Sequence, residues 1–182
     1  PLGGIRPRRM YHWLARRAFP EAPAPERFRW HRDRFGHRFR VHPYYLIDRN
    51  IVAFGSHEPE LLAYLAGAVR PGSVCIDAGA NFGAVTMLLA GAVGPSGRVH
   101  AFEPVPAVRA RLVEHVAANG FGAIVDVHEE ALAAENGTAT FHVAGSAEFN
   151  QGLGSLLHAS RPGEMSEIPV RTLRLDDFAD RL

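Results

Sequence analysis

Val74-Cys-Ile-Asp-Ala-Gly-Ala-Asn-Phe-Gly83 is the stretch of sequence that decides the fold. Its first three residues are β-forming and apolar, which predicts a buried strand. Gly79 and Gly83 then predict a turn. The nearly all-apolar residues 84–93 (AVTMLLAGAV) predict a helix packed between a sheet and its neighbours. Because strand-to-helix turns of this kind bind ligands, we expect a cofactor at the turn.

The same alternation of strand and helix continues along the chain. Residues 98–102 predict a second strand, 106–119 a second helix and 123–128 a third strand. Two strands joined by a helix within about 30 residues form a βαβ unit, whose strands run parallel. A further helix is predicted at 58–69, with Pro59 in its first turn. The predicted fold class is therefore α/β, with a Rossmann-like parallel sheet.

The N-terminal third of the chain has a different pattern. Residues 1–26 predict a basic arm, with a short amphipathic helix at 5–19 and a proline-rich linker at 21–26. In residues 27–56, apolar residues alternate around Gly36, which predicts a small β-hairpin, and 51–54 predict one more strand. We expect this β-rich segment to cap the main sheet. Residues 57–182 form the predicted Rossmann-like domain.

The C-terminal part predicts mainly strands. Residues 132–137 predict a turn, and 138–143 and 168–173 predict strands. A helix is predicted to begin at Leu175. Residues 145–166 are rich in glycine, serine and polar groups, and we expect a mobile loop there.

Composition limits the classes of function. With 182 residues and 47% hydrophobic content, the chain is long enough for one domain with a core. No apolar run approaches the roughly 20 residues of a membrane span. The single cysteine, Cys75, excludes a disulfide within the chain and a cysteine-based zinc site, and a reducing cytoplasm is the simplest expected location. Residues 1–50 hold 12 arginines against 4 acids, which we interpret as a solvated basic segment, with no nucleic-acid partner expected.

Two carboxylates narrow the choice of cofactor. Asp77 lies at the tip of the first strand, where it would repel the pyrophosphate of a dinucleotide, and the turn lacks the Gly-x-Gly-x-x-Gly spacing. An aminoacid ligand with a cationic group fits better. Glu103 follows the second strand, 20 residues after Gly83, where a carboxylate can accept hydrogen bonds from both ribose hydroxyls of an adenosine. Together the two residues indicate S-adenosylmethionine. The alternative is that Asp77 is a helix cap and Glu103 a surface acid.

The chain resembles the FkbM-type S-adenosylmethionine-dependent O-methyltransferases over about residues 45–182. The motifs that carry the resemblance are His57–Pro59, Asp77–Gly83, Ala101–Pro106, Asn119, Glu130–Leu132, Asn136–Thr138 and Thr172–Phe178. The resemblance implies that Asp77, Gly79, Asn81 and Gly83 line the methionine end of the cofactor, and Ala80 is a further predicted cofactor-binding residue. It implies that Glu103 holds the ribose and that Glu130 and Ala131 lie near the adenine.

The resemblance also implies a class I methyltransferase fold with a seven-stranded sheet. Members of the family continue past the Leu-Asp-Asp segment into a strand with a Lys-Ile-Asp-Val-Glu-Gly-type motif, so we expect the cofactor half of a longer protein here. The implied acceptor is a hydroxyl of a sugar, a glycolipid or a polyketide-type metabolite. No metal-ligand spacing stands out.

Several functional questions stay open at the level of sequence. No catalytic base is identified, and His57, Glu58 and His128 are candidates because they lie near predicted strand tips. An NAD-binding oxidoreductase and a non-catalytic fragment or interaction module are the alternative functions. The oligomeric state is also open.

Overall fold

The structure is a computed structural model that describes residues 27–144 and 165–182. The predicted arm at 1–26, with its helix, and nearly all of the predicted loop at 145–166 lie outside the described residues. In chain order the elements are β1 (Arg29–Arg32), β2 (Arg38–Val41), α2 (Leu46–Phe54), α3 (Pro59–Ala68), β3 (Val74–Ala78), α4 (Ala84–Val93), β4 (Arg98–Phe102), α5 (Pro106–Ala118), β5 (Val125–His128), β6 (Ala131–Ala133), β7 (Gly137–Ala144), β8 (Met165–Arg174) and α6 (Leu175–Ala179).

The centre of the molecule is a parallel sheet with strand order β3-β4-β5. This confirms the predicted α/β class and the predicted parallel βαβ units. The registers Asp77↔Ala101 and Phe102↔His128 bring the carboxyl ends of the three strands to one edge. The expectation that β3 is fully buried is wrong at its start, because Val74 is 58% exposed. In the described part of the chain β3 is an edge strand, paired only with β4.

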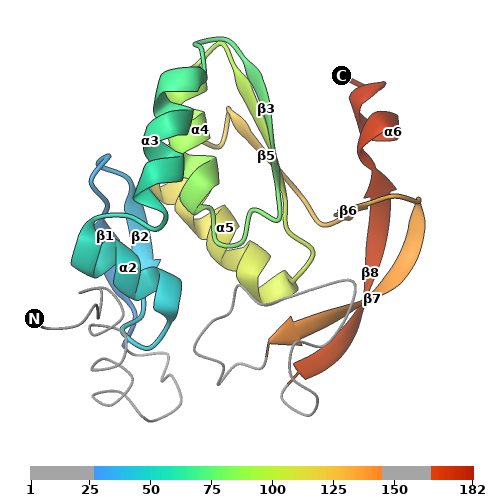
Figure 1. Cartoon of the computed structure of the whole chain (residues 1–182), viewed down its shortest axis with the longest axis horizontal. Coiled ribbons are helices and arrows are strands. Elements are labelled where there is room, and N and C mark those ends of the chain that lie inside the picture. Colours follow the sequence, from blue (N-terminus) through green and yellow to red (C-terminus); the bar gives the residue numbers. More distant parts are fainter. Residues whose placement is uncertain (1–26, 145–164) are drawn as a thin grey trace, which may run out of the picture.

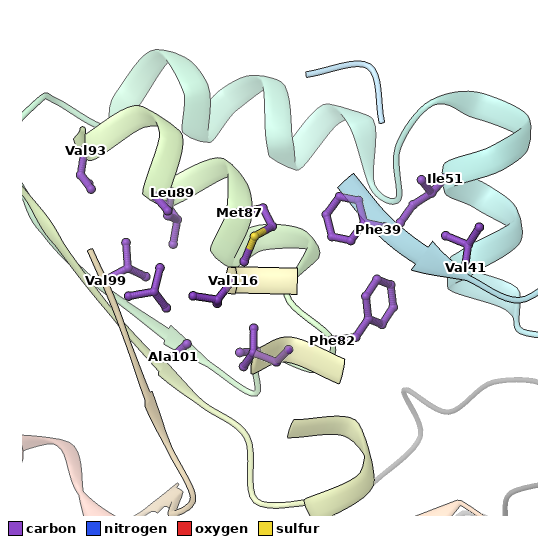
Figure 2. Close-up of a cluster of buried hydrophobic side chains, with 14 residues drawn as sticks. Phe39, Val41, Ile51, Phe82, Met87, Leu89, Val93, Val99, Ala101 and Val116 are labelled. Atoms are coloured by element: carbon purple, nitrogen blue, oxygen red, sulfur yellow. The ribbon is translucent and has the colours of Figure 1, made fainter. Parts of the chain in front are cut away.

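Helices α3, α4 and α5 lie on the side of this sheet that faces the hairpin (Figure 1). Helix α4 begins and ends where the sequence predicts, and its side chains enter the core on several sides because the helix is apolar almost all round. Figure 2 shows Met87, Leu89 and Val93 of α4 facing residues of β4 and α5. Met87 and Val93 are fully buried, and burying a side chain of this size stabilises the fold by about 1.5–3 kcal/mol.

The hairpin predicted around Gly36 is confirmed as β1 and β2, which pair antiparallel. It packs on α5 and α2, so it covers the helix layer and not the sheet itself. The strand predicted at 51–54 is wrong, because these residues belong to helix α2. The β-branched Ile51 favours a strand by propensity, but its side chain is buried one helical turn after Ile47, and Gly55 ends the helix with φ 75°. Tertiary packing decides the structure here.

A second sheet follows β5, with strand order β6-β8-β7. β8 pairs parallel with β6 and antiparallel with β7, so the predicted strands at 138–143 and 168–173 are confirmed as partners. The turn predicted at 132–137 is partly wrong, because β6 includes Leu132 and Ala133. Helix α6 then places Phe178 against the side chains of His100, Phe102 and His128, on the side of the central sheet away from the hairpin (Figure 1).

Candidate functional site

The glycine turn between β3 and α4 is held in a conformation that its residue types permit. Gly79, Asn81 and Gly83 have positive φ angles of 76°, 52° and 98°. Glycine adopts this conformation freely and asparagine does so more readily than most residues. The N–H groups of Gly79 and Ala80 donate to the carbonyl of Phe102, at 3.0 and 2.9 Å, and this fixes the turn to the end of β4.

The two glycines of the turn serve different purposes. A Cβ added at Gly83 would lie 2.6 Å from Cδ1 of Leu112, so close packing against α5 requires glycine there. A Cβ added at Gly79 would meet no atom of the described residues within 4 Å. The backbone of Gly79 therefore borders open space at the carboxyl edge of the sheet, where a ligand can approach the main chain closely.

Asp77 is the buried acid of this turn. The residue is 9% exposed, and Oδ2 accepts a hydrogen bond of 2.6 Å from the hydroxyl of Thr86 in the first turn of α4. Burial raises the pKa of Asp77, although the bonds from Thr86 oppose that rise. Among the described residues, no Arg or His side chain forms an ion pair with Asp77. A buried carboxylate with only a neutral partner favours a cationic ligand.

Glu103 braces the turn from the tip of β4. Its Oε2 accepts from the N–H of Asn81 at 2.9 Å, and its Oε1 accepts from the N–H of Val105 at 2.8 Å. Burial raises the pKa of this carboxyl group, while the two backbone bonds act in the opposite direction. Glu103 is 6% exposed, so the alternative that it is a surface acid is wrong. Each oxygen retains a lone pair that a ligand hydroxyl can use.

The structure therefore brings together one group of predicted site residues at the ends of β3 and β4: Asp77, Gly79, Ala80, Asn81, Gly83 and Glu103. The alternative that Asp77 acts as a helix cap keeps some support, because its carboxylate does face the first turn of α4. Such a contact also suits the positive end of the helix dipole.

Glu130 and Ala131 lie beyond the end of the neighbouring strand β5. The edge is continuous with the turn, since the N–H of Glu103 donates to the carbonyl of His128 at 3.0 Å. Glu130 pairs with Arg171 of β8. Burial alone would raise the pKa of Glu130, but hydrogen bonds and the charge of Arg171 hold it below its usual value. Its carboxylate is thus engaged with the second sheet and with none of the other predicted site residues.

The three candidate bases do not converge on the turn. His57 bonds to Asn50 at 2.9 Å and lies 4.0 Å from Glu58. The ring of His128 stacks on Phe102, with centroids 4.5 Å apart, and its Nε2 lies 3.2 Å from a ring nitrogen of His100. No described hydrogen bond or ion pair joins any of the three candidates to Asp77 or to the Glu103 carboxylate, so the structure does not identify a base.

Two residues that the sequence reasoning missed belong to the site's surroundings. Thr86 holds the Asp77 carboxylate. Its signal in the sequence is a single hydroxyl within an otherwise apolar helix. His115 of α5 bonds to the carbonyl of Phe82 in the turn at 2.8 Å. This contact joins residues 33 positions apart and has no local signal.

The described residues contain neither a metal-binding cluster nor a membrane-spanning helix. In residues 27–144 and 165–182, no group of three or more His, Cys, Asp or Glu side chains is arranged to hold a metal ion. The helices of the same two ranges include none with the length and apolar character needed to cross a membrane.

Comparison with solved structures finds similarity to methyltransferases. A Clostridium thermocellum protein described as a putative rRNA methylase is 24% identical, with a TM-score of 0.39 over 40% of this chain and 39% of its own. A Thermotoga maritima SAM-dependent O-methyltransferase is 24% identical, with a TM-score of 0.39 over 63% of this chain and 43% of its own. A putative transferase from Pyrococcus horikoshii is 13% identical, with a TM-score of 0.48 over 67% of this chain and 47% of its own. The chain spans less than half the length of each.

The assignment to a family comes from the sequence. Comparison with proteins of curated function finds no match. The family described as the methyltransferase FkbM domain matches residues 77–182, which is more than half of the chain. This confirms the resemblance predicted from the motifs. The matched range begins at Asp77 and also contains Glu103. The cofactor of these enzymes is S-adenosylmethionine, and the chain belongs to the FkbM methyltransferase family.

Proposed function

We propose that the protein binds S-adenosylmethionine at the carboxyl edge of β3 and β4 and methylates a hydroxyl group of a sugar, a glycolipid or a polyketide-type metabolite. The observation that carries the proposal is the buried Asp77 carboxylate, which has no cationic partner among the described side chains and lies beside an open glycine turn. The acceptor class is the one that the family resemblance implies.

The residues present fit the methionine end of the cofactor. Asp77 would accept a hydrogen bond from the cationic amino group, and this would offset the cost of keeping a buried carboxylate ionised. Gly79, Ala80, Asn81 and Gly83 would line the same end. The open space beside Gly79 permits a ligand to contact the backbone directly.

The residues also fit the adenosine end. Glu103 has one lone pair left on each oxygen, and both oxygens are already fixed in position by backbone N–H groups. Two hydroxyls of a ribose would complete its hydrogen bonding. Glu130 and Ala131, at the end of the neighbouring strand, are the proposed neighbours of the adenine ring.

The chemistry requires alignment more than acid or base strength. The bound cofactor supplies an activated methyl group on a sulfonium. The residues of this chain would hold the cofactor in one orientation and exclude water, so that the acceptor oxygen meets the methyl group in line. Removal of the acceptor proton would need a base, for which His57, Glu58 and His128 stay the candidates.

An NAD-dependent oxidoreductase is the alternative enzyme, and Glu103 alone would suit it. Asp77 disfavours it, because a dinucleotide would bring its pyrophosphate to this strand tip and turn. A non-catalytic module is the alternative outside the enzymes.

Calorimetric titration tests the proposal. We expect S-adenosylmethionine and S-adenosylhomocysteine to bind to the chain and NAD not to bind, and Asp77→Ala and Glu103→Ala to weaken both sulfur ligands. Binding of NAD without the sulfur ligands would exclude the methyltransferase function. Binding of none of the three would favour the non-catalytic module. The acceptor class needs a separate assay, in which methyl transfer to hydroxylated sugars, glycolipids and polyketides is compared with transfer to amines.

A further inference from the structure

Side chains of α5 and of its C-cap residue Asn119 form hydrogen bonds with the edge of β2 that is not paired with β1. Asn119 bonds to both backbone groups of Arg38, with its Oδ1 accepting at 2.7 Å and its Nδ2 donating at 2.9 Å. Nε2 of His115 accepts from the N–H of Arg40 at 2.9 Å, and Arg111 donates to the carbonyl of Arg40 at 2.9 Å. Four helical residues rise about 6 Å and two strand residues about 6.7 Å, so the spacings match. Side chains of a helix thus replace a third strand.

His115 differs from the other two residues because it also forms a hydrogen bond with the backbone of the glycine turn. Its Nδ1 lies 2.8 Å from the carbonyl oxygen of Phe82. Since Nε2 accepts from Arg40, Nδ1 must carry the hydrogen and donate it to Phe82. One neutral imidazole therefore bonds the hairpin through one nitrogen and the turn through the other. A protonated ring would present a second N–H to the N–H of Arg40 and lose that bond.

The surroundings keep the ring neutral and in place. His115 has no exposed surface, and burial lowers its pKa to about 4, with the charges of Arg111 and Arg40 acting in the same direction. The rings of Phe39 and Phe82 pack edge-on against it, with centroids 5.2 and 5.7 Å away. Figure 2 shows these two phenylalanines next to each other at the meeting point of hairpin and turn.

The bonded carbonyl lies within the candidate site. Phe82 stands between Asn81, whose N–H donates to Glu103, and Gly83, the N-cap residue of α4. Loss of the bond to Phe82 would free one side of the turn, while the bonds that the turn donates to the Phe102 carbonyl and the Glu103 carboxylate hold the other. The position of the turn therefore depends on the hairpin as well as on β4.

We propose that His115 is a positioning residue, which ties the glycine turn to the hairpin and so holds the turn in the conformation that binds the cofactor. The inference rests on the proposed function. It links the hairpin to the candidate site through His115.

The test compares three variants of the chain by calorimetric titration with S-adenosylhomocysteine. His115→Phe keeps the ring and removes both bonds, and we expect its Kd to rise about tenfold, which corresponds to one well-made hydrogen bond. His115→Gln retains one donor and one acceptor, and we expect it to recover most of the affinity. Asn119→Ala is the control, because it loosens the same hairpin edge without a bond to the turn. We expect its Kd to stay within about twofold of the unmodified chain.

Amide hydrogen exchange gives a readout that needs no cofactor. In His115→Phe we expect the amide of Gly83, which donates to Ala80 at 2.9 Å, to exchange faster while amides within β4 keep their protection. Equal loss of affinity in Asn119→Ala and His115→Phe, or unchanged exchange at Gly83, would overturn the proposal. If the unmodified chain binds no sulfur ligand, the proposed function fails, and the exchange comparison still decides whether His115 holds the turn.

Discussion

Asp48 and Asp77 are both buried, but the protein treats their charges differently. Asp48 of α2, 1% exposed, accepts two bonds from Arg111, at 2.8 and 3.0 Å, and one from the N–H of His42 at 2.7 Å. Asp77 of β3, 9% exposed, has the hydroxyl of Thr86 as its described side-chain partner. Burial raises the pKa of both carboxyl groups, but the charge of Arg111 opposes the rise only at Asp48.

The different partners of Asp48 and Asp77 indicate different roles for the two residues. A buried ion pair with further hydrogen bonds is satisfied within the fold, and its loss damages the fold. A buried acid with a neutral partner gains little from ionisation until a cation arrives from outside. We therefore interpret Asp48 as a structural residue, and we propose that a cationic ligand would balance the charge of Asp77.

The largest expected effect comes from breaking the satisfied pair. Asp48→Asn leaves the Arg111 guanidinium, 11% exposed, without its carboxylate. We expect the free energy of unfolding to fall by about 3–5 kcal/mol, because an uncompensated buried charge is costly. Urea unfolding followed by circular dichroism measures the change.

A double variant provides the control for that experiment. Asp48→Asn combined with Arg111→Met removes both charges, and we expect it to recover part of the loss. A double variant less stable than Asp48→Asn alone would mean that the stacking of Arg111 on Phe82, 4.7 Å from the ring centroid, matters more than the charge.

The same contrast explains how much of the molecule the sequence predicts. Asp77, the glycine turn and Glu103 follow strands with local signals, and parallel pairing necessarily brings their strand ends together. Their positions, the α/β class and the family were all predictable. The contacts of Asp48 with Arg111 and of Arg38 with Asn119 span 63 and 81 residues and depend on how the hairpin docks. No local pattern encodes such docking. The strand predicted at 51–54 is wrong because the packing of Ile51 within α2 outweighs its propensity for a strand.

The second largest effect is the loss of stability at low pH that we expect from His115. The pKa of His115 is about 4 in the fold and about 6.5 in an unfolded chain, so between these values the unfolded state binds more protons. The contribution of His115 to the free energy of unfolding is therefore complete above about pH 6.5. About 3 kcal/mol of it is lost as the pH falls toward 4. Urea unfolding across this range measures the loss.

His115→Gln isolates that contribution from the carboxyl groups. Asp48, Asp77 and Glu103 have raised pKa values in the fold and contribute in the opposite direction, gaining stability as the pH falls. These three carboxyl groups are present in both His115→Gln and the unmodified chain, so their contribution cancels in the comparison. The groups nearest to the ring are Arg111 on its own helix and Arg40 on β2, which stay charged throughout. An equal pH dependence in the variant and the unmodified chain would contradict the assignment.

The third effect is the loss of cofactor affinity that we expect when Asp77 is neutralised. Asp77→Asn makes the same chemical change as Asp48→Asn, yet we expect the free energy of unfolding to stay the same or rise slightly, since Thr86 can still donate to the amide oxygen. We expect Kd for S-adenosylmethionine to increase about 10- to 100-fold, because a charge-assisted bond of about 1.5–3 kcal/mol is lost. Unfolding and titration of both asparagine variants measure the contrast. A large destabilisation by Asp77→Asn would make Asp77 a structural acid like Asp48.

The smallest expected effect tests whether burial, and not the pairing of charges alone, makes Asp48 important for stability. Arg40 of the same hairpin pairs with Glu114 of α5 at 3.2 Å, but these side chains are 39% and 34% exposed. Solvent screens a pair of this kind, and we expect Glu114→Gln to lower the free energy of unfolding by no more than about 0.2–1 kcal/mol. Added salt should remove most of that difference while leaving the effect of Asp48→Asn nearly unchanged, because buried charges are screened less. If Glu114→Gln lowered the free energy of unfolding as much as Asp48→Asn, surface ion pairs would hold the hairpin as strongly as the buried pair. The contrast between buried and exposed pairs would then be wrong.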